Sequence, residues 1–180
     1  MPSLVFDSAI YRDAFGTEAM RQVFSDEAAV ARQVEVEVAL AKVEGRLGVI
    51  PQEAAAEIAR RSDASKIDLA KLKQRTDVVG YPIVGLVAQL AQQCGEAGRY
   101  LHWGATTQDV MDTGLVLQLR EALALVGTDL EALEAALAKL ARDHRLTVMA
   151  GRTHLQQALP ITFGYKAAVW LSMIVRHRRR

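Results

Sequence analysis

The chain has 180 residues, of which 51% are hydrophobic and 24% are charged, a composition typical of globular proteins rather than of disordered or membrane proteins. Its net charge of +1 gives no field that would favour nucleic acid or anionic lipid as a partner. The single cysteine, Cys94, excludes an intrachain disulfide framework, and no apolar run approaches the roughly 20 residues that span a bilayer. We therefore expect a cytoplasmic protein that binds neither membrane nor nucleic acid.

The pattern of the first hundred residues predicts helices that are separated by glycine and proline. Apolar residues recur there at spacings of three and four, and no segment shows the alternation of a strand. Glycines mark helix ends, and a proline can open a first turn. The predicted helices are Asp26–Arg46, Pro51–Arg61, a helix opening after a capping box at Ser65-x-x-Asp68, and Pro82–Gln93. The fold class expected is all-α.

A helical pattern then runs from Thr107 to Arg142 almost without interruption. Such a helix would be roughly 50 Å long at 1.5 Å per residue, which suggests a bundle shared between subunits. An extended two-helix hairpin would produce the same pattern. Its apolar stripe consists of Leu115, Leu119, Ala122, Val126, Leu130, Leu133, Leu137 and Leu140.

The remaining chain is expected to contain a connecting segment, residues 147–160, and a helix from Ile161 to the last residue. Because that helix has no stop signal, we expect the sequence to be part of a longer one. The domain organisation predicted is an N-terminal helical domain over residues 1–103 and the start of a central long-helix bundle over residues 104–180.

One polar loop opens onto the long helix. Gly104 is followed by Thr106 and Thr107, whose hydroxyl and backbone N–H groups at a helix start could hold a carboxylate. Ordinary N-capping would account for one of the two threonines. It would not account for Gln108 and Asp109 beside them, so both interpretations stay open.

A second polar segment surrounds His154. Histidine transfers protons near neutral pH, and Thr153 and Gln156 could orient either the imidazole or a substrate. The alternative is a histidine that only makes structural hydrogen bonds. The four histidines share no ligand spacing with one another or with Cys94, and no phosphate-binding loop is found, so we expect neither metal nor cofactor.

Together these segments resemble a known family. The order "HWGATTQDVMDTG", a leucine-rich helix and "AGRTHLQQALPITFGYK" is similar to the fumarase/aspartase superfamily, and within it to 3-carboxy-cis,cis-muconate cycloisomerases. "YRDAFGTEAMRQVFSDEAAVARQVEVEVALAKVEGRLGVIP" looks like the N-terminal domain of this family, so the likeness covers essentially all 180 residues. It implies an all-helical homotetramer that acts on a small-molecule polycarboxylate.

The resemblance also implies roles for individual residues. Thr106 and Thr107 match a pair that binds a substrate carboxylate, with Gln108 and Asp109 beside it. His154 matches a histidine that positions substrate or donates a proton. The matching neighbours of that histidine are Thr153 and Gln156.

The sequence departs from the family pattern at two places, and the two departures favour different members of the family. Thr76 and Asp77 fall where adenylosuccinate lyases carry His-Asp, so the histidine of that pair is missing. His154 stands where some muconate cycloisomerases carry a bulky residue, which favours the lyases.

The superfamily's Gly-Ser-Ser-x-Met-Pro-x-Lys-x-Asn-Pro loop, which brings the serine base and a lysine, has no counterpart in this sequence. In the superfamily, one site gathers three regions from three subunits, and this chain can supply two of them. We therefore expect the chain alone to be inactive.

The function favoured is cycloisomerisation of 3-carboxy-cis,cis-muconate to a carboxymuconolactone in the breakdown of protocatechuate-type aromatics. It is a β-elimination run in reverse. The alternatives are an adenylosuccinate-type lyase that releases fumarate and a non-catalytic helical oligomerisation module.

Overall fold

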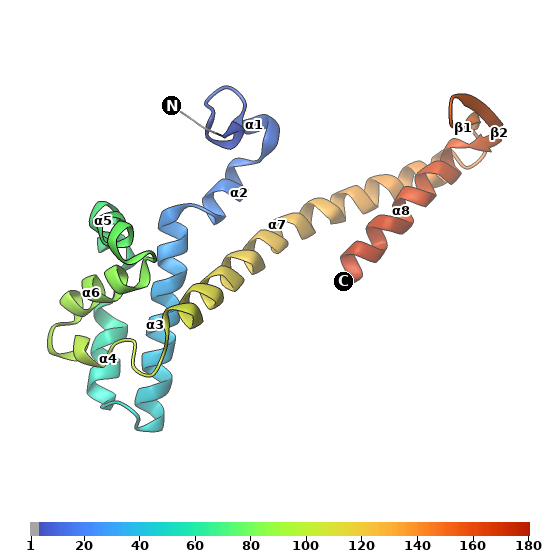
Figure 1. Ribbon diagram of the computed structural model, residues 1–180. Helices are drawn as coiled ribbons and strands as arrows, with labels where there is room; N and C mark the ends of the chain where they lie inside the picture. Colours follow the sequence, from blue (N-terminus) through green and yellow to red (C-terminus); the bar gives the residue numbers. More distant parts are fainter. Residues whose placement is uncertain (1–3) are drawn as a thin grey trace. The chain divides into compact units, whose positions relative to one another are not determined.

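The computed structural model describes residues 4–180 and consists of helices with one short β-hairpin. The all-α expectation is confirmed for the fold as a whole. In chain order the elements are η1 (Val5–Asp7), α1 (Arg12–Phe15), α2 (Glu18–Val23), α3 (Asp26–Leu47), α4 (Gln52–Arg61), η2 (Ala64–Lys66), α5 (Leu69–Val79), α6 (Ile83–Cys94), η3 (Gly95–Tyr100), α7 (Thr107–Asp143), β1 (Val148–Thr153), β2 (Gln156–Thr162) and α8 (Phe163–Arg179) (Figure 1). None of these described helices is both long and apolar enough to cross a membrane.

Contacts divide the chain into two compact units, one ending at Ala122 and the other running from Leu123 to Arg180. The division falls inside the continuous helix α7. Because a division within a helix does not mark a domain end, the domain boundary expected between residues 103 and 104 stays a prediction.

The core of the first unit lies where α3, α4 and α6 pack together (Figure 1). Each helix presents an apolar face at the spacing of three and four that its sequence predicted. A close approach between α3 and α4 occurs at Gly45, where an added Cβ would collide with the Cβ of Ala55. The buried apolar residues of these helices are Val30, Val34, Ala41, Ala54, Ala55, Ile58, Ile83, Leu86, Leu90 and Cys94.

Helix ends follow their capping residues. The Ser25 hydroxyl accepts a hydrogen bond from the Ala28 N–H at the start of α3, and Gly48 ends that helix at a φ of 73°. The capping box expected at Ser65 is wrong in detail, because the cap of α5 is Asp68, whose carboxylate accepts from the Lys71 N–H. Ser65 instead lies in the short turn η2, capped by Asp63.

The long helix predicted from Thr107 is confirmed as the single helix α7 of 37 residues. In the first unit it packs on α3 through Gly114, whose added Cβ would lie 3.3 Å from Cγ of Gln33. The buried Gln118 amide donates to the Val23 carbonyl at 2.7 Å, and Arg32 pairs with Glu121 at 2.8 Å. Much of the leucine stripe is exposed nonetheless; its exposed members are Leu115, Leu119, Val126 and Leu133.

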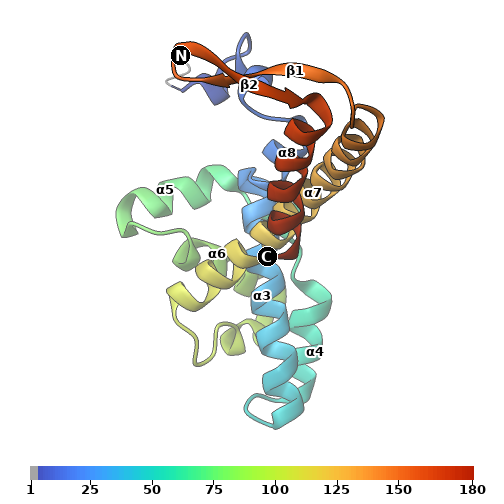
Figure 2. The same ribbon diagram turned by 90° about the vertical axis from the view of Figure 1, so that its right-hand side faces the viewer.

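In the second unit, residues 148–162 form the antiparallel hairpin of β1 and β2, followed by α8 (Figure 2). The expectation of a plain connecting segment over 147–160 is therefore wrong. The strands join through the two-residue turn His154–Leu155, with Leu155 at a φ of 57°. Helix α8 begins close to the end of α7, since an added Cβ at Gly164 would lie 2.7 Å from the carbonyl oxygen of Ala141.

Candidate active site

The loop between η3 and α7 carries the first polar segment. It is anchored at one end by Leu101 and at the other by Val110, both buried. Between them the backbone takes the left-handed conformation twice, at His102 with a φ of 59° and at Gly104 with a φ of 70°. Glycine adopts this conformation freely, whereas histidine does so rarely, so the conformation at His102 needs support from its surroundings.

The loop ends at the N-terminus of α7, where Thr106 precedes the first helical residue. The Thr106 N–H donates to Oδ2 of Asp109 at 2.9 Å, which is the return half of a capping box. Gln108 donates from its amide to Oδ1 of Asp112 at 2.6 Å. Asp109 and Gln108 thus have structural partners, while Thr106 is exposed and Thr107 half-buried at the helix start.

The first turn of α7 suits an anion. The N–H groups of Thr107 and Gln108 lie where a helix has no internal acceptor, and the helix dipole places partial positive charge there. The hydroxyls of Thr106 and Thr107 stand beside these N–H groups along the chain. This arrangement can hold one carboxylate without any cationic side chain.

Beneath the loop, helix α3 buries two carboxylates. Glu37 has no exposed surface, and its Oε1 lies 2.6 Å from Nδ1 of His102. Glu44 is 9% exposed. Oε2 of Glu37 and Oε2 of Glu44 are both buried without a hydrogen-bond partner in the described part of the chain. Burial raises the pKa of Glu37 against the opposing hydrogen bond of His102, and burial, then the charge of Glu37, raises the pKa of Glu44.

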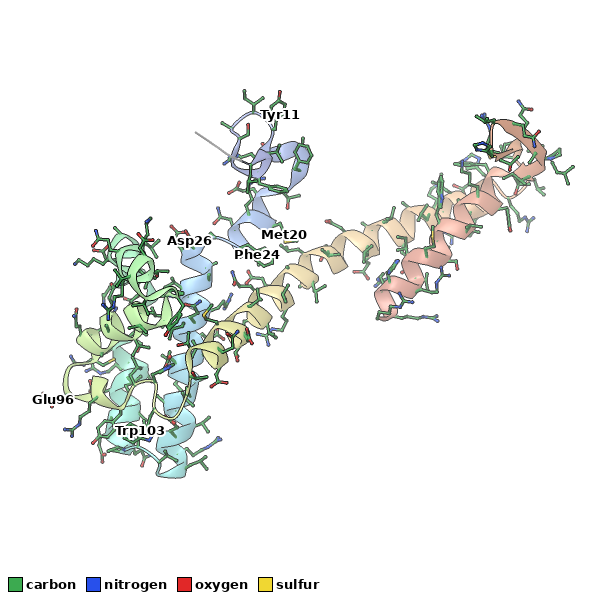
Figure 3. The ribbon with its side chains drawn as sticks, viewed as in Figure 1. Tyr11, Met20, Phe24, Asp26, Glu96 and Trp103 are labelled. Atoms are coloured by element: carbon green, nitrogen blue, oxygen red, sulfur yellow. The ribbon has the colours of Figure 1, made fainter. Side chains whose placement is uncertain are left out.

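Glu44 also lines a pocket of about 340 Å³ at the start of α7. Trp103, the exposed aromatic residue of the loop (labelled in Figure 3), forms part of its wall, as does Asp109. The full lining is Val36, Leu40, Glu44, Trp103, Gly104, Ala105, Asp109, Val110 and Thr113. The candidate carboxylate site therefore borders a hollow with two acidic groups in its wall.

Thr76 and Asp77 lie in the last turn of α5, and both make hydrogen bonds within that helix. The Thr76 hydroxyl donates to the Leu72 carbonyl at 2.9 Å, and Lys73 donates to Oδ2 of Asp77 at 2.6 Å. Thr76 also lines a separate pocket of about 220 Å³ with Gln33, Lys73 and Pro82. Their role as substrate ligands stays a prediction.

The second polar segment lies at the tip of the hairpin. Thr153 and Gln156 are paired across the strands, so they flank the turn that carries His154. All three residues are exposed. The structure thus groups Thr153, His154 and Gln156 in the second unit, and Thr106 to Asp109 in the first.

Sequence reasoning missed Glu37, Glu44 and the anchoring of His102. A signal was present, because Val30, Val34, Glu37, Ala41 and Glu44 follow one another at spacings of four, three, four and three. Two acidic residues within the buried stripe of a helix indicate polar partners on another element. His102, 65 residues after Glu37, is that partner for Glu37.

A protein-family model described as lyase matches residues 11–180. N-acetyl-S-(2-succino)cysteine lyase of Dickeya dadantii (strain 3937) is 47% identical over 180 residues, which are 100% of this chain and 40% of that protein.

Solved structures give the same picture. The fumarate lyase from Mesorhizobium sp. BNC1 superposes with a TM-score of 0.86 at 55% identity, covering 92% of this chain and 39% of that one. The beta-carboxy-cis,cis-muconate cycloisomerase from Acinetobacter calcoaceticus sp. ADP1 superposes with a TM-score of 0.91 at 41% identity. That match covers 94% of this chain and 41% of the cycloisomerase chain. The chain thus spans about 40% of the length of the proteins it matches.

Proposed function

Because the chain belongs to the fumarase/aspartase superfamily of lyases, we propose that the complete protein adds a group to, or eliminates it from, the carbon–carbon double bond of a polycarboxylate. The observation that carries this proposal is the N-terminus of α7. It combines a Thr106–Thr107 pair, first-turn N–H groups for which a helix has no i−4 acceptor, and an Asp109 already engaged as a cap.

The chemistry places one demand on the site. Both elimination and its reverse pass through an anion in which negative charge builds up on a substrate carboxylate, as in an enolate. Hydrogen-bond donors fixed at a helix N-terminus stabilise that charge without having to reorganise. Thr106 and Thr107 would hold this carboxylate, and His154 would donate the proton or orient the substrate, with Thr153 and Gln156 beside it.

The first candidate reaction is the conversion of 3-carboxy-cis,cis-muconate to a carboxymuconolactone. One substrate carboxylate adds across the activated double bond, and a proton is delivered to the neighbouring carbon. The 41% identity to a solved cycloisomerase over 94% of this chain supports this candidate. It would place the protein in the breakdown of protocatechuate-type aromatics.

The second candidate is a lyase that releases fumarate from a succinyl group. Two observations favour this candidate. They are the 55% identity to a solved fumarate lyase and the 47% identity to an N-acetyl-S-(2-succino)cysteine lyase, whose name indicates a succinyl thioether as substrate. The presence of His154 favours it too. Elimination from such a thioether would break the carbon–sulfur bond, release the thiol and leave fumarate.

We also propose that the complete protein is a homotetramer. The support is the exposed apolar side of α7, which a monomer would leave in water. Its exposed large residues are Leu115, Val116, Leu119, Leu123, Val126 and Leu133. In such an assembly other copies would cover this side, and the site would take residues from more than one copy.

The test is a pair of assays on the complete protein. Loss of the diene absorbance of 3-carboxy-cis,cis-muconate would support the first candidate, and fumarate released from N-acetyl-S-(2-succino)cysteine or from adenylosuccinate would support the second. Absence of turnover on all three substrates would contradict both candidates and favour a non-catalytic oligomerisation module.

A further inference from the structure

We propose that His102, tied to the buried Glu37 of α3, is a positioning residue that holds the carboxylate-binding loop in its working conformation. This inference rests on the proposed function, because it assigns to Glu37 and His102 a task at the same site. Neither residue is expected to touch the substrate.

The backbone shows why a tether is required. His102 has a φ of 59°, in the left-handed region that side chains larger than glycine rarely occupy. Such a conformation persists only when neighbouring contacts impose it. Four residues later the chain reaches Thr106, so the direction taken at His102 sets where the loop delivers the start of α7.

The contact with Glu37 is suited to this task. The Nδ1–Oε1 distance is 2.6 Å, the Glu37 side chain is 0% exposed and that of His102 is 21% exposed. Because Glu37 sits in the middle of α3 and among the core residues, its carboxylate is a fixed point. The bond persists whether the proton resides on Nδ1 or on Oε1, so the tether does not depend on one ionisation state.

A purely structural histidine is the rival explanation. It would stabilise the fold and leave substrate affinity unchanged once the protein is folded. A positioning residue would alter the Michaelis constant, because the donors at Thr106 and Thr107 would no longer be held where the carboxylate binds. The two explanations therefore differ in KM, and thermal stability does not separate them.

The experiment compares variants of the complete protein on whichever substrate the wild type turns over. His102→Leu and Glu37→Leu each remove the tether and are expected to raise KM by about tenfold and to lower kcat as well, because the same donors stabilise the anion that forms during the reaction. The double variant should be no worse than either single variant, because both break one contact. His102→Asn should keep KM within about threefold, since asparagine tolerates positive φ and carries an amide nitrogen near the position of Nδ1.

Gln118→Leu is the matched control. It removes another buried hydrogen bond of the same unit, from the Gln118 amide to the Val23 carbonyl, at a site away from the loop. It should lower the melting temperature and leave KM unchanged. If His102→Leu does not fold, His102→Gln takes its place, because its longer side chain shifts the amide away from Nδ1; its KM should exceed that of His102→Asn by at least about fivefold.

Each result of these kinetic measurements either supports the positioning role of His102 or overturns it. If the tether variants show the wild-type KM and only a lower melting temperature, as expected of the control, His102 is structural and the inference is overturned while the proposed function stands. If His102→Asn raises KM as much as His102→Leu does, the Glu37 contact is not what matters and the inference also falls. A wild type without turnover on any polycarboxylate would overturn the proposed function and this inference with it.

Discussion

His102 and Glu37 are joined by a hydrogen bond of 2.6 Å between Nδ1 and Oε1, across 65 residues of sequence and into the core of the first unit. The same helix, α3, buries Glu44 seven residues later. Burying two carboxylates costs stability, and natural cores accept that cost where the groups serve a purpose. The loop above them leads directly to Thr106 and Thr107.

The cost of burying Glu44 predicts a pH-dependent stability. Burial and the charge of Glu37 raise the pKa of Glu44 above its ordinary value of 4.5, so the folded state binds a proton more tightly than the unfolded state does. Stability should therefore fall as the pH rises from about 4.5 through the raised pKa. Glu44→Gln removes the charge and should raise the melting temperature at pH 7 but not at pH 4. An equal gain at both pH values would contradict the assignment.

Asp109 is predicted to matter to the helix itself. Its carboxylate accepts from the Thr106 N–H at 2.9 Å, so Asp109→Ala leaves that donor without its partner and should cost about 1 kcal/mol in the free energy of unfolding. Chemical denaturation measures this cost. Asp129→Ala, at an exposed position on the same helix, is the control and should change stability by less than about 0.5 kcal/mol. Equal stability of the two variants would argue against the cap.

The two threonines are predicted to bind substrate. Thr106→Val and Thr107→Val keep the size of the side chain and remove the hydroxyl, and each should raise KM by about tenfold through the loss of one hydrogen bond to a charged group. Thr107→Ser should stay near the wild type. Thr128→Val is the matched control, because it makes the same change at an exposed position on α7. A KM unchanged in both Thr106→Val and Thr107→Val would contradict a substrate-binding role for the two hydroxyls.

His154 is predicted to act in the chemical step. In the complete protein, His154→Ala should lower kcat by about 100-fold or more if the imidazole transfers a proton. Its exposed position at a hairpin tip means that stability should hardly change. Steady-state kinetics with a parallel melting curve separates the two effects. A change in kcat below about threefold would remove His154 from the mechanism.

Helices were the part of the fold that the sequence revealed best. Apolar spacing in α3, α6 and α7 is regular, and the bounds predicted for these helices agree with the structure to within one residue at each end. The hairpin was missed because its strands carry Gly151 and Pro160, which weaken a strand pattern, and because its turn is His154–Leu155 rather than an Asn-Gly type.

The candidate site was predictable only where its residues are neighbours in sequence. Thr106 to Asp109 stand together at a helix start, so local chemistry pointed to them. The Glu37–His102 contact joins two elements that only the folded chain brings together, and a buried carboxylate in an apolar stripe gives no clue to which residue will meet it. Local chemistry made His154 a candidate beside a purely structural interpretation, and the family resemblance is what favoured the catalytic role.

We propose that the α7 N-terminus and the hairpin tip serve one site shared between copies of this chain. The most direct measurement is complementation between two impaired forms of the complete protein, the double variant Thr106→Val, Thr107→Val and the variant His154→Ala. Mixed oligomers, isolated by two different tags, are assayed at substrate concentrations below KM. Our account predicts turnover above that of either parent, because some sites then combine intact threonines from one copy with an intact histidine from another. Turnover no greater than that of the more active parent would contradict this prediction.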